Sequence, residues 1–103
     1  MSISNDDTAF VEELFAPLGP VTHRKMMGGL TIYSQGQVFA ILDSQGTVFL
    51  KAKGAFADTM KNAGARRFGA DDGARMGYWT MPDDGIDDPE IAATWARQAL
   101  ANI

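Results

Sequence analysis

Residues 22–51 read THRKMMGGLTIYSQGQVFAILDSQGTVFLK, and this stretch decides the fold. It alternates apolar runs of strand length with short turns that contain glycine, a pattern typical of a β-meander. The middle run, VFAIL at residues 38–42, is unbroken and apolar, so we expect a central strand that is covered on both faces. The runs LTIYS and TVFLK beside it alternate in polarity, which predicts flanking strands with one drier face.

Glycines divide the meander at three places. Gln35-Gly36 suits a tight hairpin, and Gly46 suits a turn that is closed by a residue in the left-handed conformation. Gly28-Gly29 stands between two strands without a polar loop, which leaves a positive φ, a bulge or close approach of another segment open. We favour a sharp bend in which at least one of the two glycines has a positive φ.

A helix is predicted before the meander. Asn5, Asp6 or Asp7 can cap it, and Pro17 and the sequence LGP at residues 18–20 end it, because proline cannot continue the hydrogen-bond ladder. Helical spacing places five apolar residues on the face that should lie on the sheet. These residues are Phe10, Val11, Leu14, Phe15 and Leu18.

A second helix of about ten residues is predicted after the meander. It would carry Phe56, Met60 and Ala63 on one side, and Gly64 is placed to stop it. We expect it to cover the sheet beside the first helix. Residues 76–81, MGYWTM, are rich in bulky side chains and predict a last strand.

The third helix has the clearest start signal in the chain. Asp88 is the expected N-cap, Pro89 occupies the first helical position, and Glu90 lies in the positive first turn. Trp95 falls inside the apolar stripe of this helix, so we interpret it as a core anchor. Four methionines on predicted strands should fill gaps in the core. They are Met26, Met27, Met76 and Met81.

These elements predict an α+β fold. It consists of an antiparallel sheet of about five strands, a β-meander plus a later strand, packed by about three helices in two layers. The chain of 103 residues is long enough for one core and too short for two, so we expect a single domain over residues 1–103.

Composition narrows the chemistry. The chain has no cysteine and one histidine, His23, which argues against disulfides, thiol chemistry, and a zinc site. We expect no metal or cofactor, and we interpret His23 as a half-exposed strand residue without a catalytic role. The sequence contains no apolar run of membrane-spanning length and no signal-peptide pattern, which predicts a cytoplasmic protein without a membrane partner.

Charge is distributed unevenly along the chain. Its net charge is −4, but residues 1–19 and residues 81–103 each sum to −4, whereas residues 20–80 sum to +4. The simpler interpretation is that the acids interact favourably with the dipoles of two helices in their first turns, while the bases of the sheet are solvated. The alternative is that five bases of the middle segment bind a partner. These candidate partner-binding residues are Arg24, Lys25, Lys51, Arg66 and Arg67.

Several segments together resemble one known family. They are RKMMGG at 24–29, VFAILDSQGTVFLK at 38–51, Gly64 with Phe68, GYWTMP at 77–82 and WARQAL at 95–100. In this order they resemble the TfoX N-terminal domain family over nearly the whole chain. The resemblance implies a compact α+β domain, found alone or in regulators of natural competence, that is a regulatory or interaction module and not a known enzyme. Its structural family positions would be Met26, Gly28, Gly29, Phe68, Tyr78 and Trp95.

Three classes of function stay open. The favoured hypothesis is a small module that binds a protein partner, or itself, through a sheet face or edge. The alternative is a nucleic-acid-associated factor, in which the five bases contact phosphates and Tyr33, Phe49 or Tyr78 stacks on bases. An enzyme is disfavoured, because the only histidine has no evident nucleophile beside it.

Overall fold

The computed structural model describes residues 5–26, 29–43, 45–66 and 77–102. The elements in chain order are α1 (Asn5–Leu14), η1 (Ala16–Leu18), β1 (Thr22–Met26), β2 (Gly29–Ser34), β3 (Gln37–Leu42), β4 (Val48–Lys51), α2 (Gly54–Asn62), β5 (Tyr78–Thr80), η3 (Asp83–Gly85) and α3 (Pro89–Ala101). Within the described residues, the five strands form one antiparallel sheet in the order β1-β2-β3-β4-β5. The predicted two-layer α+β fold is confirmed.

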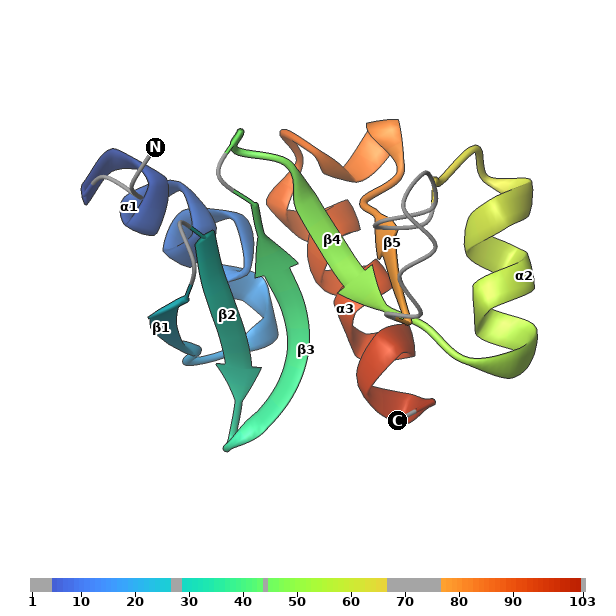
Figure 1. Ribbon diagram of the computed structural model, residues 1–103, viewed down its shortest axis with the longest axis horizontal. Helices are drawn as coiled ribbons and strands as arrows, with labels where there is room; N and C mark the ends of the chain where they lie inside the picture. Colours follow the sequence, from blue (N-terminus) through green and yellow to red (C-terminus); the bar gives the residue numbers. More distant parts are fainter. Residues whose placement is uncertain (1–4, 27–28, 44, 67–76, 103) are drawn as a thin grey trace.

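The two faces of the sheet have different neighbours. On β1, Nε2 of His23 lies 3.3 Å from Oε2 of Glu12 on α1, so His23 points to the helix side, which we call the inner face. Helices α1 and α3 lie behind the sheet on this side (Figure 1). Because side chains alternate along a strand, Arg24 points to the opposite, outer face. Its register partners form a row across that face: Thr31, Ile41, Phe49 and Thr80.

Strand β3 is covered on both faces, as predicted. Its last four residues, 39–42, are all buried. Ile32 pairs with Ala40 whereas Tyr33 pairs with Val38, which leaves Phe39 as the extra residue of a bulge. The ring of Phe39 meets that of Phe15 edge to face, with centroids 5.1 Å apart. The bulge therefore brings an aromatic side chain into the core below α1.

Gly29 differs from the expected positive φ. It begins β2 opposite Met26, and it is not among the described glycines with a positive φ. A Cβ atom at this position would collide with the carbonyl oxygen of Leu42. Gly29 is thus not a glycine with the expected positive φ, and the close approach of the β3 backbone, one of the alternatives left open, explains why glycine stands here. Gly28 lies outside the described residues.

The two other glycine turns are confirmed. Gln35 and Gly36 both have positive φ, 51° and 82°, as a type I′ hairpin turn requires. Gly46 has a φ of 83°, and its N–H donates to the Asp43 carbonyl at 3.1 Å. The Asp43 carboxylate accepts two more backbone N–H groups of this turn. The local conformation of the turn residues therefore fixes the β2-β3 and β3-β4 connections, and the Asp43 side chain supports the second.

Helix α1 is shorter than predicted. It ends at Leu14, and the chain continues through the 3-10 helix η1, which carries Pro17. Val11, Leu14 and Phe15 are buried as expected, but 37% of Phe10 is exposed. Residues 11, 14 and 15 share one narrow arc of the helix, and Phe10 lies at its edge. The core covers that arc and leaves Phe10 at the surface.

Helix α2 lies at a different place from the one predicted. Phe56 and Met60 are buried and Gly64 has a φ of 92°, as expected, but Ala63 is exposed. The helix packs beside β5, at the far side of the sheet from α1, so the expectation that it lies beside α1 is wrong (Figure 1). Because β5 extends the sheet past β4, the helix between these strands covers that side.

Helix α3 begins as predicted. The Asp88 carboxylate accepts the N–H groups of Glu90 at 3.1 Å and Ile91 at 3.3 Å. The helix buries a row of small side chains, which lets it lie close to the sheet: Ala92, Ala93, Ala96 and Ala99. Arg97 Nη2 donates to the Pro17 carbonyl oxygen at 3.0 Å, which ties α3 to η1.

Trp95 is an anchor that stays partly exposed. Its ring packs on the core and lies 6.2 Å from the Phe56 ring, between centroids. Its Nε1 donates to Oδ1 of Asp84 at 3.2 Å, which holds η3 against α3. Met81 fills the core as expected. Met27, Met76 and the Met26 side chain lie outside the described residues.

Candidate functional site

The predicted basic residues of the sheet lie apart from one another. Arg24 on β1 and Lys51 on β4 both belong to the outer face, but three strand spacings, about 14 Å, separate their strands. Lys25 is exposed and follows Arg24, so it points away from the outer face. The alternation of a strand therefore divides the Arg24-Lys25 pair between two faces.

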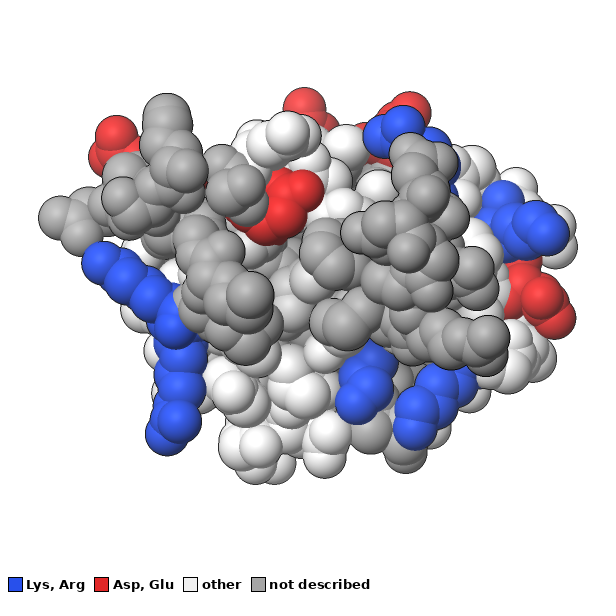
Figure 2. Space-filling view, in the orientation of Figure 1, with Lys and Arg blue, Asp and Glu red and all other residues white. Residues whose placement is uncertain are grey.

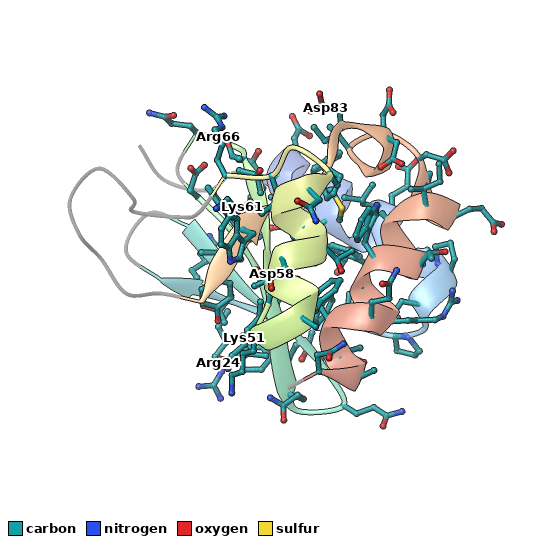
Figure 3. All side chains as sticks on the ribbon, turned by 90° about the vertical axis from the view of Figure 1, so that its right-hand side faces the viewer. Arg24, Lys51, Asp58, Lys61, Arg66 and Asp83 are labelled. Atoms are coloured by element: carbon teal, nitrogen blue, oxygen red, sulfur yellow. The ribbon has the colours of Figure 1, made fainter. Side chains whose placement is uncertain are left out.

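Arg66 lies at another end of the molecule. It follows α2, and its backbone pairs with Thr80, since Thr80 N–H donates to the Arg66 carbonyl at 2.8 Å. Figure 3 shows Arg66 near Asp83, whereas Arg24 and Lys51 lie toward the opposite end. Lysines and arginines are scattered around the periphery of the face in Figure 2. The four described candidates do not form one cluster, and Arg67 lies outside the described residues.

Two tyrosines of the outer face accompany Lys51. Tyr78 is the register partner of Lys51, and Tyr33 lies on the same face of β2. Burial raises the pKa of Tyr78 above its usual 10.0, and the nearby Tyr33 adds to the effect. Both rings are half-buried, whereas Phe49 is buried. Of the three aromatic residues considered for stacking, Tyr33 and Tyr78 thus remain partly accessible.

A pocket of about 330 Å³ lies where α1, β4, β5 and η3 meet. Its floor includes the buried residues Val48, Met81 and Pro82. Phe10 and Ile86 also line it, with 37% and 44% of their surface exposed. They are the large apolar side chains that stand exposed in the described part of the chain. Both of them therefore belong to one pocket.

A second hollow adjoins this pocket. It has a volume of about 210 Å³ and is lined by Phe10, Glu13, Leu14, Asp87 and Pro89. Phe10 lines both hollows, so they meet at this residue. We call the two hollows together the Phe10 groove.

Acidic side chains surround the Phe10 groove. Asp83 lines the larger hollow, and Glu13 and Asp87 line the smaller one. All three are exposed, and none of them forms an ion pair with a described residue. Arg66 is the basic residue that lines the larger hollow. The groove thus has an acidic end at Glu13 and Asp87, and a mixed end at Arg66 and Asp83.

The sequence contained one signal of this site. The acidic segments at the start and end of the chain supply Glu13, Asp83 and Asp87, and the fold brings them together. Sequence reasoning missed the groove, because it placed Phe10 in the core and gave Ile86 no role.

The comparison with protein families decides the classification. The model of the TfoX N-terminal domain family matches residues 13–103. The chain belongs to the TfoX N-terminal domain family. Separate searches of the curated proteins and of the solved structures found no match.

The structural family positions that the structure describes contribute to the fold of this TfoX N-terminal domain. Gly29 accommodates the β3 backbone, and Tyr78 begins β5. Trp95 joins α3 to Phe56 and Asp84. Phe68 lies outside the described residues, as do Gly28 and the side chain of Met26.

The described part of the TfoX N-terminal domain shows neither a metal-binding cluster nor a membrane-spanning helix. In residues 5–26, 29–43, 45–66 and 77–102, no group of three or more His, Asp or Glu residues is arranged to hold a metal ion. No helix in these same ranges is long and apolar enough to cross a membrane.

Proposed function

We propose that this TfoX N-terminal domain is a small cytoplasmic regulatory module that binds a protein partner and performs no catalysis. The observation that carries the proposal is the gathering of Phe10 and Ile86 at one pocket. Exposed apolar side chains are commonly scattered singly, whereas an apolar site with a polar rim is typical of protein interaction. The family resemblance adds the expectation of a competence-related regulatory role.

The surroundings of His23 support a non-catalytic role. Among the described residues, the carboxylate of Glu12 is the hydrogen-bond partner of its imidazole. This pair joins α1 to the edge strand β1, so packing of the helix accounts for it. A nucleophilic site would instead need a hydroxyl or thiol within reach of the ring.

A capture experiment tests the proposal. The tagged domain, its Phe10→Ser/Ile86→Ser variant and a Lys61→Gln control would each be incubated with extract of the native cells, with and without nuclease. We expect the parent and the Lys61→Gln control to retain the same protein under both conditions, and the double variant to lose it. Phe10 and Ile86 are 37% and 44% exposed and neither belongs to the buried core, so the variant should fold.

Two outcomes would contradict the proposal. Loss of the captured protein on nuclease treatment would show that nucleic acid, and not the domain itself, holds that protein. Equal retention by the parent and the double variant would show that Phe10 and Ile86 do not bind the partner.

One observation favours the nucleic-acid alternative. Tyr33, Lys51 and Tyr78 share the outer face, and such a combination of aromatic rings with a cation suits single-stranded nucleic acid. The net charge of −4 and the separation of the other bases weaken this alternative. A titration with labelled single-stranded RNA or DNA, parent against Lys51→Gln, distinguishes it from protein binding.

A further inference from the structure

The chemistry of the Phe10 groove indicates what kind of partner fits it. We propose that the groove binds a protein segment that presents one or two apolar side chains flanked by lysine or arginine. This inference rests on the proposed function, because it names the partner class of the same site. It assigns the apolar contact to the larger hollow and the basic flank to the smaller one.

The apolar part of the proposal follows from the larger hollow. Val48 and Met81 are buried at its floor, and Phe10 and Ile86 stand at its walls. A side chain that enters would cover these walls and remove apolar surface from water. The volume of about 330 Å³ is at the lower end of the roughly 300–1,000 Å³ typical of ligand pockets. Such a hollow suits one or two side chains as anchors.

The basic part of the proposal follows from the rim. Glu13, Asp83 and Asp87 are exposed acids, and the described residues provide no ion pair to any of them. A cationic partner would therefore gain electrostatic complementarity without first breaking an ion pair among the described residues. Arg66 lines only the larger hollow, where it would repel a basic residue of the partner. A basic residue is therefore favoured beside Glu13 and Asp87, at the smaller hollow. The groove thus places the basic flank of the bound segment at the smaller hollow.

The same charges disfavour a second copy of the chain as the occupant. A two-fold dimer through the groove would use the same patch on both subunits, which would bring two acidic rims into one interface. Like charges facing each other across an interface are unfavourable. A basic segment of another protein satisfies the rim, whereas a second groove does not.

Synthetic peptides test the proposal directly. The probe is a short capped peptide with central leucine and phenylalanine flanked by lysines, and two matched peptides replace the lysines by glutamate or the apolar pair by serine. Binding would be followed by titration of the ¹⁵N-labelled full chain, which gives affinity and location together. We expect the lysine peptide to bind at least about tenfold tighter than either matched peptide. The amide shifts should centre on Phe10, Val48, Met81 and Ile86.

Variants separate the two parts of the site. Phe10→Ser/Ile86→Ser should weaken binding of the lysine peptide about tenfold or more, as loss of an interface anchor does. Glu13→Gln/Asp87→Asn should weaken it severalfold and reduce its salt dependence. Asp58→Asn is the matched control, because Asp58 is an exposed acid on α2 that lines neither hollow. It should bind like the parent.

Three outcomes would overturn the inference. They are binding of the glutamate peptide as tight as that of the lysine peptide, amide shifts centred outside the groove, and weakening of binding by Asp58→Asn as large as that caused by the groove variants. If the capture experiment depends on Phe10 and Ile86 while the peptides show no preference for lysine, the proposed function stands and the basic partner class is wrong. If lysine peptides bind the groove but capture does not depend on it, the proposed function fails at this site.

Discussion

At Gly29 the backbones of β2 and β3 leave no room for a side chain. A Cβ atom there would collide with the Leu42 carbonyl oxygen and lie 3.4 Å from Cα of Asp43, and neither backbone atom can rotate away. We expect Gly29→Ala to lower the free energy of unfolding by about 1–3 kcal/mol, as overpacking does. Urea unfolding of the parent and the variant measures this difference.

Gly77→Ala is the matched control for this prediction. A Cβ at Gly77 would have its nearest contact at 3.4 Å, with the Ala52 carbonyl oxygen. We expect a change of less than about 0.5 kcal/mol, as for an ordinary surface substitution. Equal midpoints for parent and Gly29→Ala would show that β3 can move away without cost.

Tyr78 makes stability depend on alkaline pH. Its pKa is raised above 10.0 in the folded protein, so the unfolded chain releases this proton first as the pH rises. Between the two pKa values the folded state binds more protons, and the free energy of unfolding therefore falls with pH. The stability is at its full value below pH 10 and is lost as the pH rises through the folded-state pKa.

Urea unfolding from pH 8 to pH 11 tests this dependence. Tyr78→Phe has no phenol to ionise at this position, so its stability should fall less steeply than that of the parent above pH 10. Parallel curves for the two proteins would contradict the raised pKa of Tyr78.

At the scale of elements, β1 is an edge strand. Within the described residues it pairs with β2 on one side only, and it presents the exposed cations Arg24 and Lys25. Charged side chains on an edge oppose pairing with another chain. We expect Arg24→Thr/Lys25→Thr to self-associate at lower concentration than the parent in sedimentation velocity.

A second double variant separates edge protection from net charge. Lys53→Thr/Lys61→Thr removes two exposed cations outside the strands, and so changes the net charge equally. It should remain as monomeric as the parent. If both double variants self-associated at the same concentration, the cause would be the change in net charge and not the exposed edge of β1.

The elements that sequence predicted best are those that local chemistry determines. Gly36 and Gly46 have the backbone conformations that their turns require, and Asp88 caps α3 with its own carboxylate. The position of α2 could not be predicted in this way. It depends on the pairing of β5 with β4, which is a contact between distant parts of the chain.

The same limit explains the candidate site. Helical spacing correctly grouped Val11 with Leu14, but it could not show that the core ends before reaching Phe10. Charge counting identified the basic middle and the acidic flanks, yet strand alternation separated Arg24 from Lys25. The groove required knowledge of which helices meet, and only the fold supplies it.

The distribution of charge over the whole molecule governs its behaviour toward DNA. The described basic candidates are spread over two faces and opposite ends, and most acids visible in Figure 2 lie toward its upper end. Few phosphates could therefore be neutralised together. We expect duplex DNA to bind only at non-specific strength, with a dissociation constant of about 10⁻⁴–10⁻⁶ M at physiological salt.

Titration of labelled duplex DNA at two salt concentrations checks this expectation. Sub-micromolar binding with a steep salt dependence would contradict it. If Arg66→Glu/Arg67→Glu then abolished that binding, the nucleic-acid alternative would replace protein interaction.

The tie between α3 and η1 has a consequence for how the protein is made. The Arg97 to Pro17 hydrogen bond joins residues 80 positions apart, and α3 is synthesised after every strand that it covers. At about 5–20 residues per second, the part of the inner face that α3 covers, on β3 and β4, stays uncovered for seconds while translation continues. During that interval the apolar side chains of these two strands that α3 later covers are open to chaperones at the ribosome. A nascent chain released before Pro89 would be a substrate for proteases and not a smaller working domain.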